Sequence, residues 1–490
     1  MTSTETVATG PMVRLYLLVV VLFGAGILFA IYGGERLVGP GGTQAHGLVG
    51  AGISAQPAVA PSSAFSAIAQ NASSPLSRLL VQIAVIVAAS WAVGCGFRYF
   101  GQPAVLGEMM AGILLGPSLF GLLAPHAFNF VFAPSSLDTL RLFSQIGVCF
   151  FMFAVGMELD LSQLRHSAHR SLVIGHSSIL IPYFLGVLLA VPLYRLYAQP
   201  GTPFAAFALI MGISLSITAF PVLVRILQDR DLFRTRLGGI ATLCAAVGDA
   251  TAWCILAFVV AVARASDFRA ASFTLALVGV YALVMLFALR PMLQRGMQKS
   301  LRHEAEPTRG ILALSFGVVL ISALCTELMG IHALFGAFVA GIAMPAGGGF
   351  RKKLIVRIEH FSSVLLLPIF FAFIGLRTQI GLLGGLQDWL ICIGIIVIAT
   401  IGKLGGTAVV GKILGMSWPE SLQLGALMNT RGLMELIVLN IGYDMGILSL
   451  RIFTMLVLMA LATTFMTGPL VSLFGRRGQD NEFCGAVRER

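Results

Sequence analysis

The residues of this sequence best suited to chemistry are charged side chains inside long apolar stretches. Asp249 stands in the stretch IATLCAAVGDATAWCILAFVV, about 13 residues after Arg236, which corresponds to roughly 20 Å along a helix. A carboxylate at that depth in a bilayer costs about 2.5 to 3.5 kcal/mol on insertion scales, so it is a functional candidate by default. The alternative is a structural aspartate that is neutralised by burial or hydrogen-bonded to a neighbouring helix.

A second polar group interrupts the stretch LQLGALMNTRGLMELIVLNIG, which contains Asn429, Thr430, Arg431 and Glu435. Arg431 and Glu435 are four residues apart, so they share one face of a helix and can form an ion pair with a purely structural role. Gly432 and the Asn-Thr pair before it indicate that the helix unwinds locally.

A third polar group lies in LSITAFPVLVRIL, where Ser216, Thr218 and Pro221 fall in the middle of an apolar stretch. Proline removes a backbone donor and leaves carbonyls free one turn earlier, so we expect the helix to break near Thr218. Two interrupted helices in the two halves of a chain are typical of a transporter site, because their ends can line an ion cavity. Lys403, in IVIATIGKLGGTAVVGKIL, either balances charge there or extends to the membrane surface.

The composition requires a membrane environment for these groups. Of the 490 residues, 57% are hydrophobic and 11% are charged, and the mean hydropathy is +0.92. Apolar stretches long enough to cross about 30 Å of hydrocarbon as helices recur along the chain. The sequence therefore predicts an all-α integral membrane protein with one N-terminal helix and about thirteen further spans. The latter lie near residues 79–98, 104–122, 138–158, 172–194, 204–226, 237–262, 271–289, 310–328, 331–346, 361–377, 387–411, 419–440 and 450–474.

Four segments follow from this pattern. We expect a membrane helix or signal anchor over residues 1–33, an extracytoplasmic Gly/Ala/Pro/Ser-rich linker over 34–77, the transport domain over 78–475 and a short cytoplasmic tail over 476–490. Lys and Arg gather in alternate short loops, which are predicted to be cytoplasmic, so the net charge of +11 does not indicate nucleic-acid binding. From the shortness of this tail we expect no nucleotide-binding domain after the last span, and we expect no cofactor or permanent metal site.

Several motifs, in order, make the chain resemble the second monovalent cation:proton antiporter family, which includes the bacterial Kef-type systems and the plant cation/H⁺ exchangers. They are GQPAVLGEMMAGILLGPSLFG (101–121), LSITAFPVL (215–223), GIHALFGAFVAGIAMP (330–345) and MNTRGLMELIVLNIG (428–442). The resemblance implies inverted repeats with two crossed, unwound helices and a homodimer. The predicted topology is compatible with a bacterial inner membrane, which we expect, and with an organellar one. The resemblance also implies that Asp249 is the ion-binding aspartate and that Lys403 is the family's basic residue. The family's usual Asp or Asn before the ion-binding aspartate is replaced by Gly248, and a single carboxylate suggests electroneutral exchange.

The expected mechanism is a competition for one site. A desolvated carboxylate can hold a proton near neutral pH, and a dehydrated Na⁺ or K⁺ favours its ionised form, so each ligand displaces the other. Thr218 and nearby carbonyls would supply further oxygen ligands, with Asn429 and Thr430 opposite. A cation channel and a non-transporting sensor with the same fold are the alternatives, because fold does not determine activity. The sequence does not distinguish K⁺ from Na⁺.

Overall fold

The computed structural model describes residues 74–158, 168–233, 235–264, 268–296, 309–345 and 350–488. Every named element in these ranges is a helix, and the pairing of Ala198 with Leu448 is an isolated β-bridge. The predicted N-terminal helix and nearly all of the predicted linker lie outside the described residues. The first described helix, α3, begins at Pro75, after an N-cap at Ser74, so it starts before the predicted domain boundary at residue 78.

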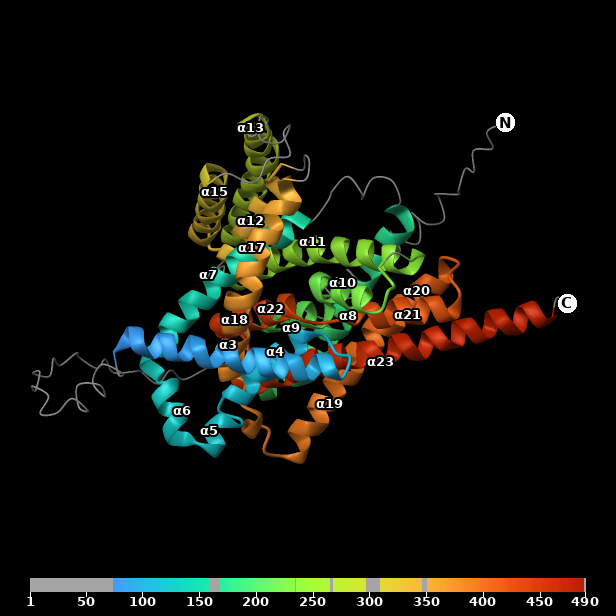
Figure 1. Cartoon of the computed structure of the whole chain (residues 1–490), viewed down its shortest axis with the longest axis horizontal. Coiled ribbons are helices and arrows are strands. Elements are labelled where there is room, and N and C mark those ends of the chain that lie inside the picture. The colour runs from blue at the N-terminus through green and yellow to red at the C-terminus, as the bar shows by residue number, and fades with distance from the viewer. Residues whose placement is uncertain are drawn as a thin grey trace, which may run out of the picture.

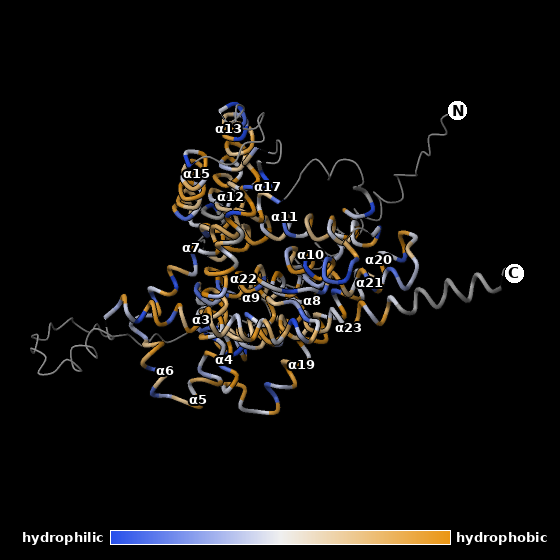
Figure 2. The backbone as a smooth tube through the Cα atoms, in the orientation of Figure 1, coloured by the Kyte–Doolittle hydropathy of each residue, from blue (hydrophilic) through white to orange (hydrophobic). Residues whose placement is uncertain are grey.

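Eleven helices of the described residues are long and apolar enough to cross a membrane. Figure 2 shows hydrophobic residues along most of their length. Two of the thirteen predicted spans are not among these eleven. The span predicted at 331–346 corresponds to α16 (Ala333–Ala343), whose 11 residues reach only roughly 16 Å. The span predicted at 419–440 is divided into α21 (Trp418–Met428) and α22 (Leu433–Asp444).

One group of helices packs around α7 and α4, and we call it the panel bundle. Its members are α3 (Pro75–Tyr99), α4 (Ala104–Leu115), α7 (Pro134–Glu158), α15 (Arg309–Leu328), α16, α17 (Phe350–Phe361), η3 (Ser362–Leu366) and α18 (Leu367–Arg377). Glycines allow these backbones to touch: a Cβ added to Gly375 would lie 1.9 Å from the carbonyl carbon of Gly112, and one added to Gly156 would lie 2.2 Å from Phe338 O.

A second group of helices contains the predicted polar residues, and we call it the site bundle. Its members are α8 (Ala168–Tyr197), α9 (Phe204–Ser216), α10 (Phe220–Asp229), α11 (Arg236–Arg264), α19 (Leu386–Thr400), η5 (Ile401–Gly405), α20 (Gly406–Ile413), α21, α22 and α23 (Leu450–Arg488). A capping box of Ser417 and Glu420 starts α21. Figure 1 shows α23 running outward beyond the other helices, so the backbone stays helical through most of the predicted tail.

The remaining helices are short or peripheral. They are α5 (Phe120–Leu123), α6 (Pro125–Val131), α12 (Phe268–Leu283), η2 (Val284–Leu289), α13 (Arg290–Gly296) and η4 (Ile380–Leu382). In Figure 1, α12, α13 and α15 lie at the top edge of the molecule, whereas α9, α10 and α22 lie near its centre. The predicted site residues therefore lie in the most enclosed part of the structure, where the α9–α10 segment is almost entirely buried.

Candidate cation and proton site

Two helix interruptions meet at the centre of the site bundle. Between α9 and α10, Ile217, Thr218 and Ala219 leave the helical conformation, and Pro221 stands in the first turn of α10. Between α21 and α22 the chain leaves the helix from Asn429 to Gly432. The two breaks are bonded to each other, because Ala219 N donates to Thr430 O at 3.0 Å and Thr218 Oγ1 donates to Met428 O at 2.8 Å. Each break thus satisfies backbone groups that the other leaves free.

Gly432 allows this close contact. A Cβ at this position would lie 2.8 Å from Val222 Cγ2 and 3.1 Å from Ala219 Cβ, on the opposite broken helix. A larger residue would therefore require the Val222 and Ala219 side chains to shift. The glycine that indicated unwinding in the sequence therefore has a packing role as well.

Arg431 binds the carbonyl end of α9. Its guanidinium donates to Ser214 O at 3.1 Å, Ile217 O at 2.9 Å and Leu215 O at 2.5 Å. The last carbonyls of a helix have no partner within the helix, and a cation beside them is also favoured by the helix dipole. Arg431 is fully buried, so it acts as an internal cap for this half-helix.

Glu435 is the second partner of Arg431, and the ion pair predicted from their spacing forms at 3.5 Å. Both side chains are fully buried. Thr464 holds the Arg431 backbone from α23, accepting from its N–H at 2.8 Å and donating to its carbonyl at 2.9 Å. Thr464 was not identified from the sequence, where its only signal is a pair of threonines in an apolar stretch.

Lys403 also binds the end of α9. It lies in the π-helical turn η5 and donates to Ser178 O at 2.8 Å and to Ser216 O. The side chain has no exposed surface, so the alternative that it extends to the membrane surface is wrong. The side chains of a π turn point in other directions than those of an α-helix. In many proteins, π turns lie at functional sites. Ser178 is another partner that the sequence did not indicate.

Asp249 lies in α11 and is completely buried. Neither of its carboxylate oxygens has a hydrogen-bond partner of good geometry among the described groups. The groups that act on it electrostatically are the Lys403 ammonium, the backbone N–H of Phe220 at the start of α10, and the Glu158 carboxylate. Buried polar groups are normally paired, so two unpaired carboxylate oxygens indicate a place where a ligand binds.

The other predicted oxygen ligands are close to the breaks but differ in their availability. The hydroxyls of Ser216 and Thr430 donate to carbonyls of their own helices, Ile213 O at 3.0 Å and Leu427 O at 2.7 Å. Each hydroxyl oxygen keeps lone pairs that can still accept or ligate. Asn429 is buried, and neither polar atom of its amide is paired within the described residues. Asn429 therefore has the greater unused capacity to bind a ligand.

A cavity of about 470 Å³ extends to this region from one end of the protein. It is lined by Ala219 and Pro221 at the break and by Arg98 and Arg225 towards the end of α3 and α10, with the carboxyl of Glu108 also in its wall. We call it the access cavity. It lies between the panel bundle and the site bundle, and Ala219 and Pro221 of the first break form part of its wall.

The opposite end contains ion pairs between the two bundles, beside a cavity of about 380 Å³ whose wall includes Arg141, Gln145 and Asp444. Thr202, before α9, donates to Gly446 O at 3.0 Å, so α22 ends where α9 begins and α10 runs to the other end. There, Asp444 of α22 binds Arg141 of α7 at 3.0 Å and Arg377 of α18 at 2.6 Å. These partly buried pairs join the panel bundle to the site bundle away from the access cavity.

Sequence comparison identifies the family. Residues 83–476 match the model of the family described as "Sodium/hydrogen exchanger, transmembrane". The chain belongs to the sodium/hydrogen exchanger family. The predicted resemblance to cation:proton antiporters is confirmed by this match and by the named relatives.

Among those relatives, the Na⁺/H⁺ antiporter NhaS4 of Synechocystis is 41% identical over 394 residues, which cover 80% of this chain and 96% of that protein. The Cation/H⁺ antiporter 17 of Arabidopsis thaliana is 39% identical over 81% of this chain and 48% of its own length. The K⁺/H⁺ antiporter 1 of Saccharomyces cerevisiae is 33% identical over 82% of this chain and 47% of its own length. The chain thus spans about half of the plant and yeast relatives.

The fold also resembles a solved member. The sodium proton antiporter MjNhaP1 of Methanocaldococcus jannaschii aligns with a TM-score of 0.58 over 82% of this chain and 98% of that chain, at 13% identity. This likeness supports the helical membrane architecture. Gly248 lies inside that architecture beside Asp249, and a Cβ added to it would meet only Ile179 Cδ1, at 3.8 Å. The neighbours of Gly248 therefore leave room for a Cβ, so packing does not require a glycine at this position.

Proposed function

We propose that this protein exchanges Na⁺ or K⁺ for protons by alternating access, with Asp249 as the shared binding site. The observation that carries the proposal is the Asp249 carboxylate, which is fully buried near the Phe220 N–H at the start of α10 and has two unpaired oxygens. A bare anion in such a place is costly unless a proton or a cation neutralises it. Relatives named as Na⁺/H⁺ and K⁺/H⁺ antiporters support the same reaction class.

The oxygen groups around the breaks suit a dehydrated alkali cation, which is a hard ion that oxygen ligands satisfy. We propose that Asn429 Oδ1 and the hydroxyl oxygens of Thr218, Ser216 and Thr430 complete the coordination that Asp249 begins. Pro221, in the first turn of α10, has no N–H to donate, so it helps to keep residues 217–219 out of a helix and leaves the oxygens of this segment available. Since one carboxylate binds either ligand, the cation and the proton displace each other.

Lys403, Arg431 and Glu435 are assigned to the framework of the site rather than to the ligand. Lys403 and Arg431 hold the carbonyl end of α9 in place, and Glu435 partly balances the Arg431 charge. The fixed positive charges of Lys403 and Arg431 keep those carbonyls from becoming an additional cation site. A mobile ion is thereby directed to the side of the break that faces Asp249.

Alternating access requires the site bundle to move against the panel bundle. We propose that the present arrangement is open through the access cavity and closed by the Asp444 ion pairs. By the positive-inside rule we infer that the Arg98 and Arg230 end is cytoplasmic, as is the C-terminus. We also propose that the membrane is the inner membrane of a bacterium. A closed far end favours an antiporter over a channel, which needs a continuous pore when it conducts. The homodimer is part of the proposal and rests on the resemblance alone.

The test is proton movement in proteoliposomes that contain a pH-sensitive dye. Addition of NaCl or KCl to wild type is expected to move protons, and the salt that acts identifies the cation. Asp249→Asn, which keeps the shape and removes the charge, is expected to abolish the signal. Asp138→Asn, at an exposed aspartate of α7, is the matched control and is expected to transport like wild type. Cation-dependent proton flux that persists in Asp249→Asn would refute the shared site.

A further inference from the structure

A second cavity lies where α3, α10 and α23 meet at the same end as the mouth of the access cavity. It has a volume of about 450 Å³, and its wall contains Arg98, Arg225, Arg230 and Asp229. We call it the arginine pocket. Three guanidinium groups face one carboxylate, so the pocket carries an excess of positive charge that no described group in its wall neutralises.

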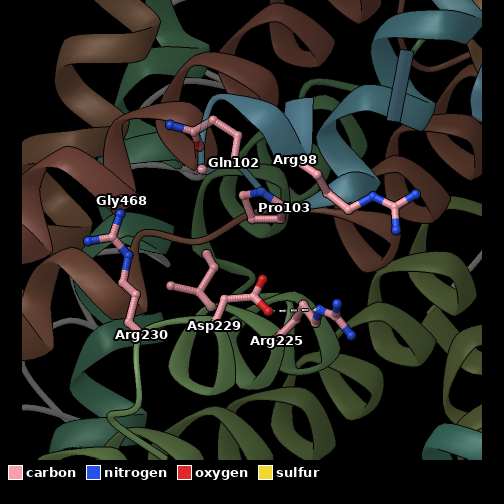
Figure 3. Close-up of a pocket in the computed structure, with 9 residues that line it drawn as sticks. Arg98, Gln102, Pro103, Arg225, Asp229, Arg230 and Gly468 are labelled. Carbon is pink, nitrogen blue, oxygen red and sulfur yellow. Dashed lines mark ion pairs between the residues drawn. The ribbon is translucent and has the colours of Figure 1, made fainter. Parts of the chain in front are cut away.

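The arginines are held in different ways. Figure 3 shows Asp229 turned toward Arg225, with which it pairs at 3.2 Å, whereas Arg230 extends toward Gly468. Arg230 donates to Ser472 Oγ, and one of its terminal nitrogens lies 2.8 Å from where a Cβ of Gly468 would be. The missing side chain at Gly468 therefore makes room for this guanidinium against α23. Among the described residues, the hydrogen bond of Arg230 is to Ser472 of α23, while Asp229 acts on it through its charge.

The pocket has spare hydrogen-bonding capacity. A guanidinium has five N–H donors in a planar fork that matches phosphate oxygens. The hydrogen bonds of Arg98 and Arg230 among the described groups use one donor each, to the sulfur of Cys95 and to Ser472 Oγ. Such a set of donors, in a cavity of the size that small ligands occupy, suits a phosphate-bearing anion.

The location identifies the source of that phosphate. The span that contains Arg98 ends at Tyr99, and the span that precedes Arg230 ends at Asp229, so the pocket lies at the membrane surface. Basic pockets between membrane helices at the cytoplasmic surface bind anionic lipid headgroups. We propose that the arginine pocket binds the phosphate of an anionic phospholipid headgroup, and that its occupancy makes it easier for a cation to enter the access cavity.

The second half of the proposal follows from shared residues and rests on the proposed antiport. Arg98 and Arg225 line both the arginine pocket and the access cavity. A cation moving toward Asp249 therefore passes two positive charges. A bound phosphate offsets them. For a charge roughly 10 Å away, at the effective dielectric constant of about 20 found near a protein surface and with salt screening, this change lowers the apparent KM for the cation by about twofold to fourfold.

Lipid binding is tested first, because it does not depend on transport. Delipidated protein is incubated with phosphatidylglycerol or phosphatidylcholine, and the lipid retained is counted by native mass spectrometry. Wild type and the control Arg236→Gln, at an exposed arginine of the same end outside the pocket, are expected to retain phosphatidylglycerol. Arg230→Gln is expected to retain at least about fivefold less. Equal retention by Arg230→Gln and Arg236→Gln overturns the proposal.

A competition arm separates the lipid from free phosphate. We expect phosphatidylglycerol to stay bound in millimolar inorganic phosphate, and phosphate alone not to change the melting temperature. If phosphate alone stabilises wild type but not Arg230→Gln, the pocket binds a soluble anion and the headgroup assignment is wrong.

The transport arm compares cation KM in liposomes of phosphatidylcholine with and without one-fifth phosphatidylglycerol. Anionic lipid also concentrates cations at the whole membrane surface, and this effect is the same for wild type, Arg236→Gln and Arg230→Gln. The KM ratio between the two lipids is expected to be about twofold to fourfold larger in wild type and Arg236→Gln than in Arg230→Gln. Equal ratios refute the effect on cation entry. If wild type shows no proton-coupled cation flux in either lipid but still retains phosphatidylglycerol, the proposed antiport is refuted and the lipid site is not.

Discussion

Removing Arg431 should be the most damaging single change among the framework residues of the site. Arg431→Met keeps most of the volume but deletes three hydrogen bonds to the carbonyl end of α9. It also leaves Glu435 without its charged partner. Each unpaired buried polar group costs about 1 to 3 kcal/mol, and removing one side of a buried ion pair costs about 3 to 5 kcal/mol. These costs overlap, so we expect a loss of at least about 4 kcal/mol of unfolding free energy.

The same geometry predicts that Glu435→Gln is much milder. The distance from Arg431 to Glu435 is 3.5 Å, whereas the three carbonyls lie at 2.5 to 3.1 Å, and those bonds survive the substitution. We expect a loss of no more than about 2 kcal/mol. The double variant should cost less than the sum of the two single variants, because the unpaired carboxylate is then absent.

The assay is unfolding of the purified protein in detergent, followed by tryptophan fluorescence and by the monodisperse fraction that remains after heating. Arg309→Met, at an exposed arginine that begins α15, is the control and should melt like wild type. If Glu435→Gln is as damaging as Arg431→Met, the main role of Arg431 is the ion pair. The assignment of Arg431 as the cap of α9 would then be wrong.

Two further predictions concern packing and closure. Gly375→Ala should lower the free energy of unfolding by about 3 kcal/mol or more, because its Cβ would overlap the backbone at Gly112. Gly248→Ala should fold normally, because its Cβ has room. Equal melting temperatures of the two variants would contradict this. Asp444→Asn should weaken the closed end, so that a cysteine introduced at Gln145, which lines a cavity of about 380 Å³ together with Arg141 and Asp444, reacts about fivefold faster with an impermeant thiol reagent, in a background without native cysteines. Unchanged labelling would show that these ion pairs do not hold that end closed. Gly248→Ala should also retain antiport, since the site needs one carboxylate.

Much of the fold could be predicted because membrane helices follow from local composition. Apolar stretches of sufficient length locate the spans, and Pro221 and Gly432 locate the two interruptions. The length of α16 could not be predicted in this way, because nothing in an apolar sequence indicates where a helix stops short of the membrane surface. Such a stop depends on the neighbouring helices, which satisfy the backbone groups at its ends.

The site was predicted as a set of residues but not as an arrangement. The spacing of Arg431 and Glu435 predicts their ion pair because both lie on one helix turn. The bonds from Arg431 and Lys403 to the end of α9 join segments about two hundred residues apart, so no local pattern contains them. Thr464 and Ser178 were missed for the same reason, since each acts through a backbone atom of a distant helix or through its own carbonyl.

The π turn that contains Lys403 affects how this helix compares with those of its relatives. A π turn contains one residue more than the α turn it replaces, so η5 acts as a single-residue insertion in the register of the helix. Deleting one residue of Ile401–Gly405 would convert the π turn into an α turn, with α19 and α20 in nearly the same orientation, and would change which residue of the turn faces the site. An alignment without a gap there would pair residues that point in different directions. During evolution, the insertion or deletion of one residue at this turn could therefore move a lysine into or out of the site without any substitution.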